Sequence, residues 1–181
     1  MTIALTGLRG SGKTKLGEIL AKELGLKFYD LDQEIEKKIK TTVKDLVEKK
    51  GWDFFRKTEN EVLTKHIEKI NKKKKLTILS LGGGTIIQKN NAKLLKKNCL
   101  IIYLQDTPEN CTKKITESNE NHTQNTRPAL TSQKTLLEEM KELYKTRHEI
   151  YKENSDIIIK RSFDAEKDVG KIIKKILAFN S

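Results

Sequence analysis

The sequence has little cysteine, little histidine and no long hydrophobic run. Its two cysteines, Cys99 and Cys111, form no CxxC pair, and its three histidines, His66, His122 and His148, form no ligand pair such as HExxH. These absences predict reduced thiols and argue against a metal ion held by protein nitrogen or sulfur. The apolar runs are much shorter than the roughly 20 residues of a membrane span, so we expect no membrane partner.

The N-terminal sequence shows no export signal. Met1 leads directly into the strand-like residues 2–5, so we expect no signal or transit peptide. Together with reduced thiols, this predicts a cytoplasmic protein. The 181 residues suffice for a domain with its own core, and no change of composition indicates a second one. We therefore expect a single domain over residues 1–181.

Arginine is also scarce, although the chain is strongly basic. Lysine and arginine number 37 against 25 acidic residues, and the net charge of +12 would suit nucleic acid, a membrane surface or a small anionic substrate. Only five of the 37 are arginine, and the lysines are scattered among acidic residues, as is typical of a solvated surface. We expect no nucleic-acid partner, and we expect the few arginines at places that need a guanidinium fork.

Short apolar segments alternate with helical segments along the chain. This pattern predicts an α/β fold with a parallel sheet whose two faces are covered by helices. The expected strands lie at 2–6, 27–30, 76–81, 99–104 and 156–159, and helical periodicity is clearest at 13–24, 53–70, 134–152 and 165–178. The segment 31–50 reads as two short helices, because Thr41 or Thr42 can cap the second. The polar segment 117–126 lacks periodicity and is expected to be a long loop or a lid.

The strongest motif is the glycine-rich segment GLRGSGKT at 7–14. It fits GxxxxGK[ST] and lies between an apolar strand and an amphipathic helix, as the P-loop requires. Its backbone N–H groups can surround phosphate oxygens. Lys13 would reach the β- and γ-phosphates, and the Thr14 hydroxyl would bind Mg²⁺ directly. The motif predicts a nucleoside-triphosphate site with Mg²⁺ as cofactor, formed by Gly10, Ser11, Gly12, Lys13, Thr14 and Lys15.

Two further segments follow expected strands at the sheet edge where ligands bind. Asp30-Leu31-Asp32 offers two carboxylates, for a Mg²⁺-bound water and for a substrate hydroxyl, although Asp32 is equally suited to be a helix N-cap. Gly82, Gly83 and Gly84 follow a strand that ends without a Walker B carboxylate. Three consecutive glycines let a ligand approach the backbone closely.

Three arginines complete the pattern. Arg56 lies on an expected helix, Arg127 follows the polar segment, and Arg147 lies on the helix before the last strand. For each one alone, a surface ion pair is as good an explanation as a ligand contact. Together with the P-loop, they indicate forks for carboxylate and phosphate anions.

Taken together, these motifs resemble the shikimate kinase family of P-loop small-molecule kinases. The matching segments, in order, are GLRGSGKT, FYDLDQEIE, TTVKDLVEKKGWDFFRKTE, LSLGGG, TRPAL and RHEIY. The resemblance implies a three-layer sandwich whose parallel sheet has the strand order 2-3-1-4-5, shikimate-binding helices at about 31–62 and a mobile lid at about 117–131. It also implies a monomer that transfers the γ-phosphoryl of ATP to the 3-hydroxyl of shikimate, on the route to chorismate and the aromatic amino acids.

The same resemblance implies roles for residues on the shikimate side. Asp32 would bind the shikimate hydroxyls and act as base. Arg56, oriented by Glu59, would bind the shikimate carboxylate together with Arg147. The backbone at Gly82, Gly83 and Gly84 would contact the ring.

On the nucleotide side, Asp30 would hold a water on Mg²⁺, beside Thr14. Arg127 would close with the lid onto the phosphates, so that Lys13, Asp32 and Arg127 would be the catalytic residues. The adenine would lie near residues 160–164.

Two alternatives remain open from the residues. A gluconate or nucleotide kinase is the nearer one, since gluconate also carries a carboxylate and hydroxyls; the set DLD, FFRKTE, LGGG and TRPAL favours shikimate. A regulatory or nucleic-acid-binding P-loop protein is the alternative from another class. The dispersed charge and the lack of an aromatic stacking stripe argue against it.

Overall fold

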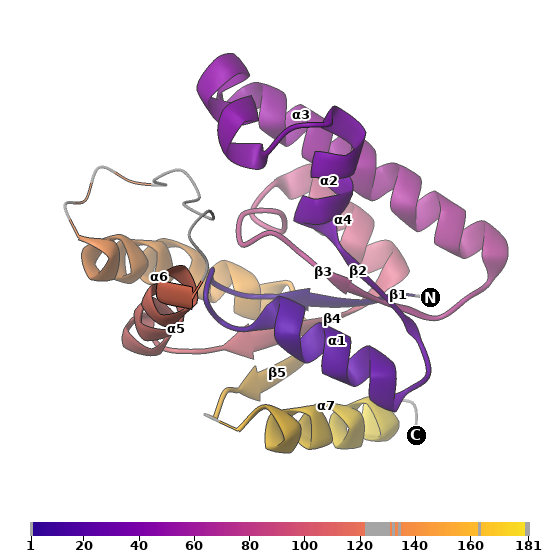
Figure 1. Ribbon diagram of the computed structural model, residues 1–181. Helices are drawn as coiled ribbons and strands as arrows, with labels where there is room; N and C mark the ends of the chain where they lie inside the picture. The colour runs from indigo at the N-terminus through magenta and orange to yellow at the C-terminus, as the bar shows by residue number, and fades with distance from the viewer. Residues whose placement is uncertain (1, 122–130, 132, 134, 163, 180–181) are drawn as a thin grey trace.

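The computed structural model describes residues 2–121, 131, 133, 135–162 and 164–179. Its five strands form one parallel sheet with the order β2-β3-β1-β4-β5, as predicted (Figure 1). The strands are β1 (Thr2–Thr6), β2 (Lys27–Asp30), β3 (Thr77–Ser80), β4 (Cys99–Gln105) and β5 (Ile157–Lys160). Each lies within a residue or two of its predicted position, because buried parallel strands carry compact apolar runs that are visible in the sequence.

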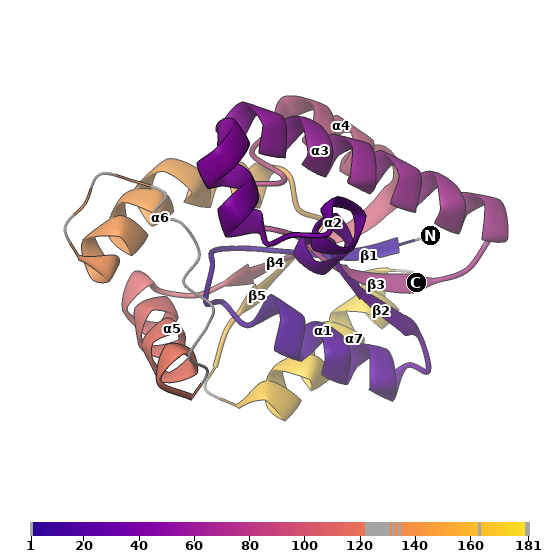
Figure 2. The same ribbon diagram turned by 45° about the horizontal axis from the view of Figure 1, so that its top comes forward.

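Helices cover both faces of the sheet and make the expected three layers (Figure 2). They are α1 (Lys13–Glu23), α2 (Leu31–Ile39), α3 (Val43–Lys73), α4 (Lys89–Asn98), α5 (Pro108–Asn121), α6 (Leu136–Glu153) and α7 (Ala165–Phe179). Alternate residues of strand β4 face opposite layers. Ile102 and Leu104 pack in the core that includes α1 and α7, whereas Ile101 and Tyr103 pack in the core beneath α3 and α6.

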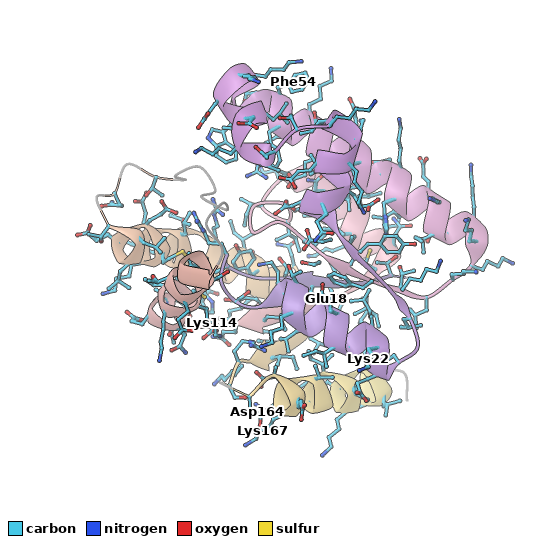
Figure 3. The ribbon with its side chains drawn as sticks, viewed as in Figure 1. Glu18, Lys22, Phe54, Lys114, Asp164 and Lys167 are labelled. Carbon is cyan, nitrogen blue, oxygen red and sulfur yellow. The ribbon has the colours of Figure 1, made fainter. Side chains whose placement is uncertain are left out.

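The lysines lie mostly at the surface, as their scattered distribution predicts. Lys22 on α1 and Lys167 on α7 are exposed (Figure 3). Among the residues that the structure describes, no helix combines the length and the hydrophobicity that a membrane crossing needs.

Two helices, α4 and α5, are absent from the sequence prediction. In α4 only Asn91, Ala92 and Leu95 are buried, which is too short a stripe to give clear periodicity. Helix α5 extends to Asn121, so the expectation of a loop over 117–126 is wrong for its first part. Glu117 and Ser118 are exposed, and a solvated helix end needs no apolar residues. The rest of the expected lid, residues 122–130, lies outside the described residues.

The segment 31–50 contains two helices, as predicted. Helix α2 ends at Ile39 and is followed by Lys40, which adopts a left-handed conformation. The Thr42 side chain caps α3 by accepting a hydrogen bond from the Asp45 N–H. Helix α3 is kinked at Gly51, whose φ of 79° and ψ of 171° are not helical. The kink separates the short segment before Gly51 from the long one that carries Arg56.

The start of α6 provides a stability test. Thr135 and Glu138 form a capping box, with the Thr135 hydroxyl accepting from the Glu138 N–H at 3.2 Å and the Glu138 carboxylate accepting from the Thr135 N–H at 3.1 Å. We predict that Thr135→Ala lowers the free energy of unfolding by about 1 kcal/mol in urea denaturation. The control is Thr146→Ala inside the same helix, which removes no cap; equal losses for the two variants would contradict the prediction.

Candidate active site

The loop between β1 and α1 forms a compact site for an anion. Gly10 and Gly12 have φ values of 78° and 84°, in the left-handed region that favours glycine. Lys13 begins α1 and is 9% exposed. Its Nζ donates hydrogen bonds to the carbonyl oxygens of Gly7 at 2.9 Å and Leu8 at 2.7 Å. A helix N-terminus and a shielded ammonium group thus meet in one loop, which favours a bound phosphate.

Asp30 and Thr14 lie beside this loop. The Thr14 hydroxyl donates to Asp30 Oδ2 at 2.8 Å, while Asp30 Oδ1 accepts from the N–H groups of Asp32 and Gln33. Asp30 is therefore the N-cap of α2, and the capping role considered for Asp32 belongs to Asp30. A hydroxyl and a carboxylate side by side are oxygen ligands of the kind that Mg²⁺ prefers, so these residues fit the expected cofactor.

A large pocket extends from the P-loop to α5 and to the loop after β5. It contains the exposed Lys15 at its rim and Lys114, which Figure 3 labels on α5. Arg161, in the segment expected near the adenine, pairs with the fully buried Asp168 at 2.9 Å. The other residues lining this nucleotide pocket are Arg9, Gly10, Gly12, Lys13, Thr14, Leu16, Asp30, Asp32, Ser80, Leu81, Lys113, Ile115, Glu117, Ser118 and Ala165.

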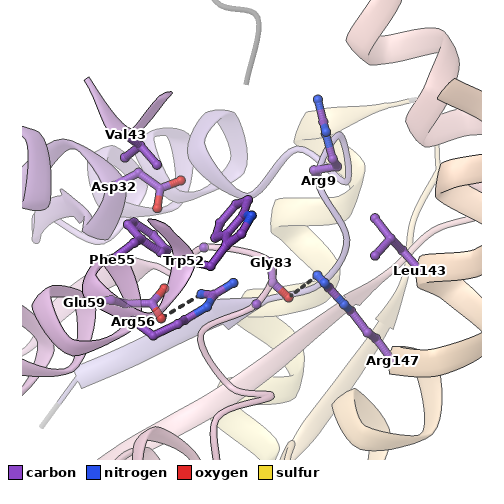
Figure 4. Close-up of a pocket in the computed structure, with 12 residues that line it drawn as sticks. Arg9, Asp32, Val43, Trp52, Phe55, Arg56, Glu59, Gly83, Leu143 and Arg147 are labelled. Atoms are coloured by element: carbon purple, nitrogen blue, oxygen red, sulfur yellow. Dashed lines mark hydrogen bonds and ion pairs between the residues drawn. The ribbon is translucent and has the colours of Figure 1, made fainter. Parts of the chain in front are cut away.

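A second pocket lies between α2, α3, the loop after β3 and α6 (Figure 4). It combines charged groups with the apolar side chains of Val43, Trp52, Phe55 and Leu143. The remaining residues lining this acceptor pocket are Arg9, Asp32, Arg56, Glu59, Gly82, Gly83, Gly84 and Arg147. An amphiphilic ring with a negative group suits such a lining.

Arg56 is held at the pocket by a fully buried carboxylate. Its Nη1 donates to Glu59 Oε2 at 2.8 Å, and Thr85 Oγ1 donates to Glu59 Oε1 at 2.7 Å. The pKa of Glu59 is raised overall, because the effect of burial exceeds that of the Arg56 charge and of the two hydrogen bonds, which lower it. A Cβ on Gly84 would lie 2.4 Å from Arg56 Nη2, so glycine is needed there to leave room for the guanidinium.

The backbone of the triple glycine is fixed from α6. The Tyr151 hydroxyl donates to the Gly83 carbonyl oxygen at 2.6 Å, and Arg147 Nη1 lies 3.4 Å from the same oxygen (Figure 4 shows the Arg147 contact). Burial raises the pKa of Tyr151 to about 12, so its hydroxyl remains a donor at neutral pH. The same helix thus carries an arginine of the pocket and positions the loop opposite it.

The structure brings the residues singled out from the sequence into these two neighbouring pockets, with two exceptions. Ser11 is buried within the P-loop and lines neither pocket. Arg127 lies outside the described residues. The sequence reasoning missed Tyr151, the apolar lining and Arg9, which together with Asp32 lines both pockets. The scarcity of arginine was the one signal that pointed to Arg9.

Comparisons with known proteins identify the family that this site resembles. The model of the shikimate kinase family matches residues 9–177. The chain is 34% identical to shikimate kinase 2 of Photorhabdus laumondii, over 96% of this chain and 93% of the relative. It is 38% identical to shikimate kinase of Bacillus subtilis, over 86% of this chain and 78% of the relative. The structure is similar to shikimate kinase from Acinetobacter baumannii in complex with shikimate, with a TM-score of 0.85 and 32% identity, over 98% of this chain and 93% of that one.

The hydrogen bond between Tyr151 and Gly83 gives a prediction for the integrity of the site. We expect Tyr151→Phe to lower the free energy of unfolding by about 1–2 kcal/mol, because the Gly83 carbonyl loses the shorter of its two hydrogen bonds. Tyr144→Phe on the same helix is the control, since the Tyr144 hydroxyl makes no hydrogen bond to any residue that the structure describes. Equal stability of the two variants in urea denaturation would show that the contact contributes nothing.

Proposed function

The chain belongs to the shikimate kinase family, and we propose that it uses the two pockets to bring the γ-phosphoryl of ATP to the 3-hydroxyl of shikimate. As a member of this family the protein is a kinase, and its reaction belongs to the biosynthesis of aromatic amino acids. One observation carries the assignment of roles. The nucleotide pocket, which contains the P-loop, and the acceptor pocket, which contains Arg56 and Arg147, share the lining residues Arg9 and Asp32.

The acceptor pocket suits shikimate, which carries a carboxylate, three hydroxyls and an apolar ring face. Arg56 and Arg147 bind the carboxylate as guanidinium forks. Trp52 and Phe55 cover the ring, and the backbone at Gly83 contacts it from the opposite side of the pocket. This arrangement leaves Asp32 to accept a hydrogen bond from the reacting hydroxyl.

In the transfer step, the 3-hydroxyl oxygen forms a bond to the γ-phosphorus, and the bond from that phosphorus to the bridging β-phosphate oxygen breaks. ADP leaves with the electron pair, and the hydroxyl proton passes to the Asp32 carboxylate. Lys13 turns from the loop carbonyls to the phosphates, and Arg127 adds positive charge from the lid. Thr14 would hold Mg²⁺ directly and Asp30 would hold it through water; the bound ion would neutralise phosphate charge.

We further propose that one copy of the chain is sufficient for the reaction and works as a single domain. The described residues assigned above line two pockets formed within one chain, which supports a monomer. The cytoplasmic location and the lack of a nucleic-acid partner stay predictions.

The experiment that tests this function is a measurement of ADP release by the purified protein with ATP and Mg²⁺. Shikimate is added in one reaction and gluconate in the other, and the phosphorylated position is found by phosphorus–proton NMR correlation. We expect release that depends on shikimate and a product phosphorylated at the 3-oxygen. Stimulation by gluconate alone, or ATP binding without any stimulated release, would contradict the proposal.

The role of Asp32 gives a kinetic prediction. Asp32→Asn keeps the shape of the side chain but removes the proton acceptor, so we expect kcat to fall by roughly 10²- to 10⁴-fold while the fold, measured by circular dichroism, is unchanged. Glu34→Gln on the same helix is the control, because Glu34 lines a different pocket, on the outer side of α2 and α3. An Asp32→Asn enzyme as fast as the Glu34→Gln enzyme would refute the role.

A further inference from the structure

Arg9 lies in the P-loop, at the place where the two pockets meet. It lines the nucleotide pocket together with Lys13, and it lines the acceptor pocket together with Arg56 and Arg147. Of the described basic residues that line either of these two pockets, Arg9 alone lines both. Asp32 is the acidic residue with the same property. In Figure 4, Arg9 and Asp32 lie across the pocket from each other.

The Arg9 side chain is held by a contact with a distant part of the chain. Its Nη1 donates to Glu139 Oε1 at 2.9 Å, and the two side chains are only 13% and 8% exposed. Because both charges are largely shielded from water, this pair restrains the guanidinium more strongly than a surface ion pair would. The Arg9 backbone lies close to the triple glycine, since its nitrogen would be 3.4 Å from a Cβ added at Gly83.

Glu139 also connects Arg9 to the acceptor side. It lies in the first turn of α6, the helix that carries Arg147 about two turns further on. The ion pair therefore joins the P-loop to the helix that supplies an arginine of the acceptor pocket. An arginine that only shaped the P-loop would not need its guanidinium at the junction of the two pockets.

We propose that Arg9 is a further catalytic residue, which stabilises the phosphoryl group while it passes from ATP to the acceptor oxygen, and that Glu139 is the positioning residue that holds Arg9 at this place. The proposal rests on the function proposed above. As the β–γ bridging bond breaks and the new oxygen–phosphorus bond forms, negative charge is spread over the three other oxygens of the γ-phosphoryl group. A guanidinium at the junction of the pockets stabilises this charge before and after the transfer.

The role predicts a specific kinetic signature. Arg9→Met keeps an unbranched, flexible side chain but removes the guanidinium and its charge, so we expect kcat to fall about 10²-fold. The KM values for ATP and for shikimate should change by less than about threefold, because Lys13 and the two acceptor arginines still bind the ground state. Thermal unfolding is measured in parallel, because a purely structural pair would alter stability without this separation of kcat from KM.

Glu139→Gln tests the positioning role. It keeps a hydrogen-bond acceptor but removes the negative charge that pairs with the Arg9 guanidinium, so we expect kcat to fall about tenfold. In an Arg9→Met background the same substitution should leave kcat unchanged, since the group it positions is gone. The matched control is Lys141→Met, which breaks an exposed pair between α6 and Glu109 on α5 and should leave kcat at the native value.

The possible outcomes distinguish a failure of the role of Arg9 from a failure of the proposed kinase function. An unmodified enzyme without shikimate-dependent ADP release would remove the proposed function and the role of Arg9 together. If the unmodified enzyme is active, an Arg9→Met variant with native kcat, or with a change confined to the KM for shikimate, overturns the role of Arg9 alone. If Arg9→Met does not fold, Arg9→Lys is tested instead, because lysine keeps the positive charge but lacks the guanidinium fork. A roughly tenfold lower kcat with unchanged KM values supports the role of Arg9. Native kinetics of Arg9→Lys overturn it.

Discussion

The parallel direction of the strands is the constraint on which the rest of the structure depends. Because β1, β2, β3 and β5 run the same way, the loops that follow them leave the sheet at one edge. The P-loop, Asp30 and Asp32, the triple glycine and the adenine-side segment therefore become neighbours, although they are far apart in the sequence. The registers of β1 and β2 with β3 bring Leu5 and Asp30 both opposite Ser80, directly before these loops. The parallel sheet thus places these loops together, and helices α3 and α6 supply Arg56 and Arg147.

Three of the arginines are held in place in the same way, by an ion pair with a buried carboxylate. Arg9, Arg56 and Arg161 each pair with a carboxylate whose side chain is at most 8% exposed, namely Glu139, Glu59 and Asp168. Burying a carboxylate is costly unless a cation and hydrogen bonds compensate it. Each pair therefore fixes a guanidinium beside a pocket that must receive anions, which explains why a chain so rich in lysine uses arginine at these positions. The lysines remain mainly on the surface, where they keep the molecule solvated.

The sequence predicts the parts of this arrangement that have local signals. Apolar runs locate the strands, and the P-loop is recognised from its own spacing. In the Asp30-Leu31-Asp32 segment the sequence suggests Asp32 as a possible N-cap, whereas Asp30 has that role, because the exact start of α2 is not visible in the sequence. Arg9 and Glu139 are 130 residues apart, and Tyr151 and Gly83 are 68 apart. Such contacts leave no pattern in one sequence. Helix α4 and the exposed end of α5 are missed because little of either faces the core.

The most direct test of the account is a crystal structure of the protein with shikimate, ADP, Mg²⁺ and aluminium fluoride, which mimics the phosphoryl group in transfer. We expect the shikimate carboxylate to bind Arg56 and Arg147, with its 3-oxygen beside Asp32. The fluoride should lie within hydrogen-bond distance of Arg9 and Lys13. Shikimate bound outside the acceptor pocket, or bound within it with its 3-oxygen turned away from the nucleotide, would contradict the account.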